Sequence, residues 1–163
     1  MTMQAASEVI TRSAAETQAL GEVLGRLAQP GDLVLLSGPL GAGKTCLTQG
    51  IARGLGVGEP VRSPTFVLAT QHPGRLMLFH VDLYRVDSLL EAADLGLDDY
   101  IEGGGVCVVE WAEKAIGVFP KEYLLVELEH IGPEERRIRL FPQGRRHEIL
   151  AKAVVSAAMR QGN

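Results

Sequence analysis

The chain has 163 residues, a formal net charge of −4 at pH 7 and a hydrophobic content of 46%. This length suits one compact domain, so we expect a single domain over residues 1–163 without a separate substrate-binding domain. The acidic balance argues against extensive direct binding of nucleic acid. No apolar run has the length of a membrane helix or the form of a secretory signal, so we expect a cytoplasmic protein that does not act at a membrane.

The first predicted elements lie before residue 31. Val9-Ile10 is typical of a short strand. Ser13-Ala-Ala-Glu16 has the pattern of a capping box, in which the serine and glutamate side chains satisfy backbone N–H groups at a helix start. It opens an amphipathic segment that stops at Pro30-Gly31, so a helix is expected there.

A phosphate-binding loop comes next. Residues Gly38 to Thr45 read Gly-Pro-Leu-Gly-Ala-Gly-Lys-Thr and match G-x-x-x-x-G-K-[ST], the P-loop. The run Asp32–Ser37 predicts a buried parallel strand before it, and apolar residues at fourfold intervals after Lys44 predict a helix behind it. Backbone N–H groups of such a loop wrap phosphates, the lysine reaches the β and γ phosphates, and the hydroxyl ligates Mg²⁺. A nucleoside triphosphate is therefore the expected ligand.

Two strand-like runs after this helix predict an antiparallel hairpin. They are Thr65–Thr70 and Leu76–Val81, with the turn-forming stretch Gln71-His72-Pro73-Gly74 between them. The segment Ser63-Pro-Thr-Phe66 lies where P-loop switch proteins keep a loop that senses the γ-phosphate. Ser63 and Thr65 are therefore candidates for a switch or a γ-phosphate sensor.

The rest of the chain completes an α/β fold, which we expect to be a P-loop NTPase-like three-layer sandwich with a mixed, mostly parallel sheet and an antiparallel hairpin. Apolar runs without alternation favour strands that are covered on both faces. The expected elements are a short helix capped by Asp87–Glu91, a buried strand at Val106–Val109 after Gly103–Gly105, strands at Tyr123–Leu128 and Arg136–Phe141, and a last helix from about Arg145 to Met159.

Two carboxylates stand at the ends of apolar strands. Asp82 closes one run and Glu110 another, at the positions where parallel strands of α/β sheets meet their ligands. A P-loop needs one acid that holds Mg²⁺ together with Thr45, and spacing alone does not rank the two. His80 and Asp82 lie two apart on one strand and share a face, so they can form an imidazole–carboxylate pair that orients a water.

Several single residues have both a functional and a structural interpretation. Arg62 and Arg85 can bring positive charge to the γ-phosphate, although surface arginines are common, and His80 and Arg85 are candidate γ-phosphate sensors. Trp111, the single tryptophan, can stack near a nucleotide or pack in the core. Cys46 and Cys107 are predicted to be buried small hydrophobic residues without a disulfide or metal role.

Four segments taken together resemble one family. They are Leu40-Gly-Ala-Gly-Lys-Thr45, Ser63-Pro-Thr-Phe66, His80-Val-Asp-Leu-Tyr-Arg85 and Val109-Glu-Trp111. In this order and spacing they resemble the bacterial TsaE family of tRNA threonylcarbamoyladenosine biosynthesis ATPases. The P-loop alone is shared by many families, whereas the combination is specific. The resemblance covers most of the chain, up to about Pro133.

The resemblance implies Mg²⁺-dependent hydrolysis of ATP in partnership with TsaB and TsaD. These proteins install threonylcarbamoyl on adenosine 37 of tRNAs that read ANN codons. Contact with tRNA is then expected only through the complex. The ATPase is expected to be weak alone and to be stimulated by the partners.

The resemblance also implies roles for individual residues. The acid matching Glu110 holds Mg²⁺ with the Thr45 hydroxyl, the acid matching Asp82 is needed for hydrolysis, and Trp111 lies near the nucleotide. The first turn of the helix at Ser13 is expected by the adenine. The residues assigned to phosphate binding are Gly38, Leu40, Gly41, Ala42, Gly43, Lys44 and Thr45, with Lys44 also catalytic.

Other nucleotide-dependent functions compete with this interpretation. A GTPase switch suits the P-loop and the segment after it, but the guanine-specific Asn-Lys-x-Asp motif is absent, since the single asparagine is Asn163. A small-molecule kinase uses the same phosphate cradle and metal. A switch module would use nucleotide binding mainly for docking. The kinase and the switch module stay open as alternatives.

Overall fold

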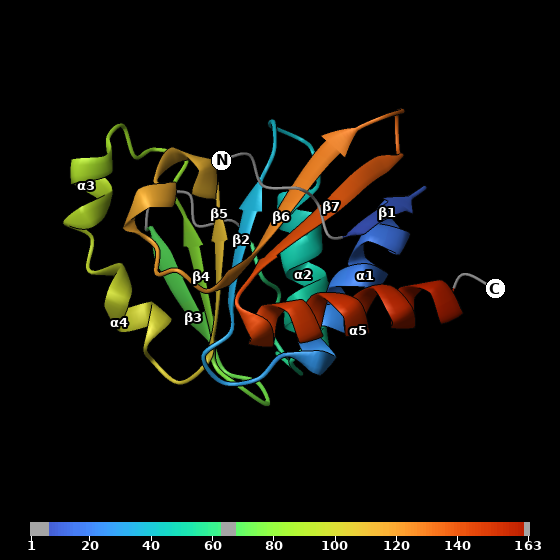
Figure 1. Ribbon diagram of the computed structural model, residues 1–163, viewed down its shortest axis with the longest axis horizontal. Helices are drawn as coiled ribbons and strands as arrows, with labels where there is room; N and C mark the ends of the chain where they lie inside the picture. Colours follow the sequence, from blue (N-terminus) through green and yellow to red (C-terminus); the bar gives the residue numbers. More distant parts are fainter. Residues whose placement is uncertain (1–6, 63–67, 162–163) are drawn as a thin grey trace.

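The computed structural model describes residues 7–62 and 68–161, which form a seven-stranded sheet with helices on both faces (Figure 1). None of the helices in these two ranges combines the length and the hydropathy that a membrane-spanning helix requires. The strands are β1 (Ser7–Thr11), β2 (Leu33–Ser37), β3 (Ala69–His72), β4 (Leu78–Asp82), β5 (Val106–Glu110), β6 (Tyr123–His130) and β7 (Arg136–Gln143). The helices are α1 (Ala14–Leu27), α2 (Lys44–Gly54), α3 (Leu89–Ala93), α4 (Leu97–Ile101) and α5 (Arg145–Gln161), with short 3-10 helices η1 (Ala112–Lys114) and η2 (Ile116–Val118).

The centre of the sheet is parallel and its edges are antiparallel. The order is β1-β7-β6-β2-β5-β4-β3, and β6, β2, β5 and β4 are parallel neighbours. The outer strands β7, β1 and β3 pair antiparallel with their neighbours. The predicted α/β fold with a mixed sheet and an antiparallel hairpin, β3–β4, is confirmed. Parallel pairing brings the carboxyl ends of β2, β4 and β5 to one edge.

Side chains that alternate along β2 point into two separate cores. Val34 and Leu36 pack with α1, α2 and α5, whereas Leu33 and Leu35 pack on the opposite face with α3 and α4. All four are at most 1% exposed. Figure 1 shows α1, α2 and α5 together and α3 and α4 apart from them. Two cores on either side of one sheet confirm the predicted three-layer sandwich.

The two helix starts for which the sequence predicts a side-chain cap, those of α1 and α3, are capped in the structure. Ser13 Oγ accepts from Glu16 N at 3.1 Å, and the Glu16 carboxylate accepts from Arg12 N at 2.6 Å. At α3, Ser88 Oγ accepts from Glu91 N at 3.0 Å. The short helix α4, which starts after a glycine without a side-chain cap, was not predicted.

The β3–β4 hairpin differs from the prediction at its turn. Strand β3 runs through His72, which pairs with Leu78, so the turn occupies residues 73–77 instead of 71–74. His72 stays in the strand because its side chain is buried and its Nδ1 lies 2.6 Å from Glu59 Oε1. This tertiary contact outweighs the turn preference of the local sequence.

Helices α1 and α2 approach each other closely through glycines. A Cβ at Gly25 would lie 2.2 Å from the Ile51 carbonyl oxygen, and one at Gly54 would lie 2.2 Å from that of Glu22. Only glycine permits such backbone contact without displacement of a helix. Because α2 begins at the P-loop, this packing fixes the loop relative to α1.

Candidate functional site

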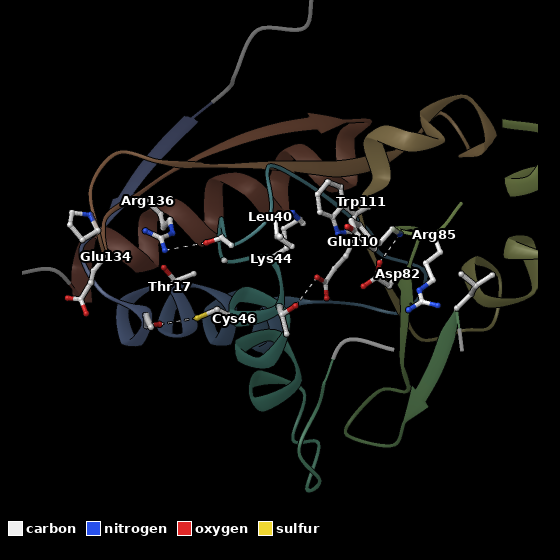
Figure 2. Close-up of a pocket in the computed structure, with 17 residues that line it drawn as sticks. Thr17, Leu40, Lys44, Cys46, Asp82, Arg85, Glu110, Trp111, Glu134 and Arg136 are labelled. Atoms are coloured by element: carbon white, nitrogen blue, oxygen red, sulfur yellow. Dashed lines mark hydrogen bonds between the residues drawn. The ribbon is translucent and has the colours of Figure 1, made fainter. Parts of the chain in front are cut away.

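A cavity of about 650 Å³ opens at the carboxyl ends of β4 and β5, beside the P-loop (Figure 2). In α/β sheets, this edge is where ligand-binding loops gather. The P-loop with the first turn of α2, the ends of β4 and β5, the start of α1 and the β6–β7 turn surround it. The lining residues are Ala14, Thr17, Leu40, Gly41, Gly43, Lys44, Thr45, Cys46, Leu68, Asp82, Tyr84, Arg85, Glu110, Trp111, Pro133, Glu134 and Arg136.

The P-loop turns from β2 into α2 at positions that require glycine. Gly41 and Gly43 have φ values of +78° and +105°, and Gly43 is the N-cap of α2. The Lys44 ammonium donates to the carbonyl oxygens of Gly38 at 2.5 Å and Pro39 at 3.0 Å. Most predicted phosphate-binding residues line the cavity. Gly38 and Ala42 do not, and Ala42 is fully buried in the core.

Lys44 is only 5% exposed and lies among three carboxylates. Burial lowers the pKa of its ammonium, while the negative charges of Glu113, Glu110 and Asp82 act to raise it. Its Nζ lies 3.8 Å from the centroid of the Trp111 ring, within the range of a cation–π interaction. The Lys44 ammonium is therefore held in place by hydrogen bonds to two loop carbonyls and by the face of the Trp111 indole.

Glu110 joins the P-loop to the neighbouring strand. Its carboxylate is 2% exposed, and Oε1 accepts from Thr45 Oγ1 at 2.9 Å. Its other oxygen, Oε2, lies 2.5 Å from His80 Nε2 and 3.5 Å from Thr48 Oγ1. The strand-end acid and the P-loop hydroxyl that the sequence singled out are thus in direct contact.

Asp82 lies beside Glu110 in the parallel pairing of β4 and β5. It is 9% exposed, and its Oδ1 accepts from Tyr84 N at 2.9 Å, which orients the carboxylate at the end of the strand. Both acids line the cavity. Sequence spacing did not rank these two carboxylates as the Mg²⁺ ligand, and the structure places them as neighbours in one site.

The expected pairing of His80 with Asp82 is wrong. His80 hydrogen-bonds Glu110 on the next strand, and its second nitrogen, Nδ1, has no hydrogen-bond partner among the described residues. His80 pairs in register with Val108 and Asp82 with Glu110, so His80 and Glu110 are diagonal neighbours on the same face of the sheet. The imidazole therefore meets the cross-strand acid.

The segment after Glu110 contacts the P-loop through Glu113 and the residues after β4 through Lys114, and the sequence analysis missed both residues. Trp111 adopts a left-handed backbone conformation with φ 59°, and its ring lies 5.1 Å from that of Tyr84. Glu113 Oε2 accepts from Gly38 N at 3.0 Å, and Lys114 Nζ donates to the Tyr84 carbonyl oxygen. No local pattern indicated these contacts, because each joins segments far apart in the sequence.

The start of α1 and the start of β7 form the other end of the cavity. Thr17 and Ala14 line it, consistent with the expectation for the first turn after Ser13. Arg136 Nη2 donates to the Gly41 carbonyl oxygen at 3.4 Å, so β7 contacts the P-loop. The sequence analysis assigned no functional residue to this part of the chain, because the resemblance fades near Pro133.

The two cysteines differ in their surroundings. Cys107 is buried as predicted, and burial raises the pKa of its thiol to about 12. Cys46 is only half-buried and lines the cavity, so its predicted core position is wrong. Its Sγ lies 3.3 Å from the Ala14 carbonyl oxygen, which holds it at the surface of α2 that faces α1.

The remaining candidates for γ-phosphate binding or sensing do not all lie at this cavity. Arg85 is exposed and lines the cavity beside Asp82. Arg62 lines a separate, smaller cavity with Gln18 and Gln49. The candidates Ser63 and Thr65 lie outside the residues that the structure describes.

The donor atoms at this site suit a hard cation. Thr45 and Glu110 offer a hydroxyl and a carboxylate oxygen 2.9 Å apart, the ligand type that Mg²⁺ prefers. Within residues 7–62 and 68–161, no group of three or more His, Cys, Asp and Glu side chains is arranged to hold a metal. Mg²⁺ generally takes few ligands from protein and fills its other positions with phosphates and water, which the two oxygens of Thr45 and Glu110 fit.

The sheet order, the P-loop and the two strand-end carboxylates define a P-loop α/β protein. The family model for threonylcarbamoyl adenosine biosynthesis protein TsaE matches residues 11–138. The chain therefore belongs to the TsaE family, and the predicted resemblance is confirmed.

Individual relatives agree with this assignment. The chain is 43% identical over 138 residues to the tRNA threonylcarbamoyladenosine biosynthesis protein TsaE of Bacillus subtilis, covering 84% of this chain and 86% of that protein. It is 42% identical over 129 residues to the protein of that name from Treponema pallidum, covering 79% and 96%. The crystal structure of YdiB from Bacillus subtilis matches it with a TM-score of 0.80 and 35% identity over 100% of this chain and 99% of that one.

Proposed function

We propose that this protein is a Mg²⁺-dependent ATPase that acts with TsaB and TsaD in the threonylcarbamoyladenosine modification of tRNA, reaching tRNA only through that complex. Membership of the TsaE family supports the pathway. The contact between Thr45 of the P-loop and the buried Glu110 carries the assignment of the chemistry, since it joins a phosphate-binding loop to a metal-binding acid. We further propose that the whole chain works as a single domain.

Phosphate binding falls to the P-loop and the start of α2. The backbone N–H groups from Leu40 to Thr45 and the positive end of the α2 dipole would hold the phosphates. The Lys44 ammonium, now bonded to the Gly38 and Pro39 carbonyls, would exchange these neutral acceptors for phosphate oxygens. Charged acceptors bind an ammonium more strongly, which supports this exchange.

Thr45 and Glu110 would hold the Mg²⁺ ion. The ion, when bound, supplies positive charge that neutralises the β and γ phosphates. The protein's own contribution is to keep both oxygen donors in place. Glu110 is well suited to this, because its carboxylate is buried and both of its oxygens have neighbours at hydrogen-bond distance.

Asp82 is the proposed catalytic carboxylate, acting as a general base. Its position beside Glu110, at the edge of the cavity, would let it orient the attacking water and accept its proton. Its Oδ1 is oriented by Tyr84 N, so the carboxylate is held for that role. Trp111 and the exposed Arg85 would lie near the reacting phosphate, and the end of the cavity at Ala14 and Thr17 would take the adenine.

The cavity volume of about 650 Å³ is that of a site for one nucleotide-sized molecule. The missing guanine motif favours adenine. We expect slow hydrolysis by the isolated protein, because P-loop ATPases gain much of their rate from charge stabilisation that another protein often provides.

The test is ATP turnover by the purified protein, with and without TsaB and TsaD and with Mg²⁺ or EDTA. We expect slow, Mg²⁺-dependent hydrolysis that rises on addition of the partners. Absence of ATP binding and of stimulation would contradict the proposal. Rapid phosphoryl transfer to a metabolite by the protein alone would instead favour a small-molecule kinase, and tight nucleotide binding without turnover in the complex would favour a switch module.

A further inference from the structure

His80 is a completely buried histidine at the bottom of the site, and the proposed function gives it no direct role. It is 0% exposed on β4, and its Nε2 lies 2.5 Å from Glu110 Oε2. This is shorter than the 2.9 Å contact between Thr45 and the other carboxylate oxygen. Because a carboxylate oxygen accepts, Nε2 is the nitrogen that donates.

The sheet register explains why the two side chains meet. His80 pairs directly with Val108 of β5, and Asp82 pairs with Glu110. His80, Asp82 and Glu110 all point to the α2 face of the sheet, since successive side chains alternate between faces. The imidazole therefore reaches Glu110 diagonally, between two strands whose backbones are held in register by the ladder.

The two carboxylate oxygens of Glu110 face different surroundings, one buried and one at the cavity. Oε2 faces the buried imidazole, and Oε1 accepts from Thr45 at the wall of the cavity. Thr48 Oγ1, which lies 3.5 Å from Oε2, already donates to the Lys44 carbonyl oxygen at 2.9 Å. Rotation of the carboxylate would break the short His80 contact, so this contact favours one orientation.

We propose that His80 is a positioning residue that fixes the orientation of the Glu110 carboxylate, so that Oε1 stays directed at Thr45 for the cation. This inference rests on the proposed function of Glu110. Ligating carboxylates and imidazoles generally depend on such outer hydrogen bonds, whose loss costs about 10- to 100-fold in metal affinity. The role differs from γ-phosphate sensing, because a fully buried imidazole on the core side of Glu110 acts through that residue.

His147 of α5 provides a matched control. It is also buried, at 4% exposure, and its Nδ1 also has no hydrogen-bond partner among the residues described. Its Nε2, however, accepts from the backbone N–H of Leu33 at 3.3 Å, at the opposite end of β2 from the P-loop. Substitution of a buried histidine should thus lower the stability of the protein at both positions, whereas a loss of Mg²⁺ affinity should appear only at His80.

The test compares His80→Gln with His80→Asn. A glutamine amide can place its nitrogen close to the Nε2 position and donate to Glu110, whereas the shorter asparagine reaches only the Nδ1 position. Calorimetric titration with ADP, in EDTA and at a series of Mg²⁺ concentrations, gives the Mg²⁺ concentration that half-maximally tightens binding. Thermal melting in EDTA checks that each variant is folded.

In EDTA, both variants should bind ADP within about threefold of the parent. His80→Asn should raise the half-maximal Mg²⁺ concentration by about 10- to 100-fold, and His80→Gln by much less. His147→Asn should lower the melting temperature and leave the Mg²⁺ dependence unchanged. An equal shift in His80→Gln and His80→Asn, or no shift in either, would overturn the inference. If His80→Asn does not fold, His80→Leu, which has no donor, takes its place and should raise the half-maximal Mg²⁺ concentration at least tenfold more than His80→Gln does; a shift no larger than that of His80→Gln would overturn the inference.

The parent protein separates this inference from the function on which it rests. If Mg²⁺ does not tighten ADP binding to the parent, the proposed metal role of Thr45 and Glu110 fails. If the parent responds to Mg²⁺ and the two His80 variants respond alike, only the role of His80 fails.

Discussion

Lys44 holds its ammonium 3.8 Å from the centroid of the Trp111 ring, and Trp111 is the single tryptophan of the chain. A cation over an indole face interacts with the ring electrons, so movement of the cation changes the surroundings of the fluorophore. Because the same ammonium is the proposed phosphate ligand, nucleotide binding should separate the two groups. The fluorescence of the protein would then report on the site without a label.

We therefore predict that ATP or ADP changes the intrinsic fluorescence of the protein in a saturable manner. The change should be lost in Lys44→Ala, whose spectrum without nucleotide should also differ from that of the parent. Titration of the emission spectrum measures this. Calorimetric binding of ATP with no fluorescence change would show that the contact between Lys44 and Trp111 survives in the complex.

Lys44→Ala and Asp82→Asn should separate binding from turnover. Loss of the Lys44 ammonium should weaken ATP binding strongly, because it removes the charged donor to the phosphates. Asp82→Asn keeps the shape of the side chain and should leave the dissociation constant for ATP within about threefold, while kcat falls by about 100-fold or more. Calorimetry and steady-state kinetics measure the two quantities. Equal loss of affinity in both variants would contradict the assigned roles.

Gly25→Ala should destabilise the protein through the contact between α1 and α2. The new Cβ would lie 2.2 Å from the Ile51 carbonyl oxygen, so the helices must separate. Overpacking of this kind costs about 1–3 kcal/mol in the free energy of unfolding, measured by urea denaturation. Gly58→Ala is the control, since a Cβ there meets nothing within 4 Å, and it should change stability by no more than about 0.5 kcal/mol. Similar losses in both variants would show that close packing is not the cause.

Stability should fall as the pH drops through the titration range of His147. Burial lowers the pKa of this imidazole below 6.5, and Arg146 adds to the effect, while Asp32 and Glu122 partly oppose it. Below pH 6.5 the unfolded chain therefore binds a proton at this position that the folded protein does not, until the folded pKa is reached. The free energy of unfolding from this group then decreases with falling pH, by at most about 1.4 kcal/mol per pH unit.

The measurement is the urea midpoint between pH 7.5 and 5 for the parent and for His147→Gln. The variant should be less stable at pH 7.5 and should have a flatter dependence on pH. Parallel curves for the two proteins would mean that other groups dominate the acid sensitivity.

Local sequence patterns were sufficient to predict most helices and strands of the fold. The capping boxes at Ser13 and Ser88 and the apolar run of β2 correspond to observed elements because they depend on residues within a few positions of each other. The hairpin turn was misplaced at His72, where a contact with Glu59, thirteen positions away, decides where the strand ends. The prediction therefore failed where a tertiary contact outweighed local preference.

For the candidate site, residue types and their spacing were sufficient to identify the P-loop, the two strand-end acids and the family, because phosphate and Mg²⁺ chemistry requires such residues in such an order. The resemblance already assigned Glu110 to the cation together with Thr45, but the hydrogen bonds of Glu110 with both Thr45 and His80 became evident in the folded chain alone. Only the structure brought Glu113 and Arg136 onto the P-loop. The contacts of Glu110, His80 and Arg136 depend on the register of strands that are distant in the sequence, and a shift of one residue would turn each of these side chains to the other face of the sheet.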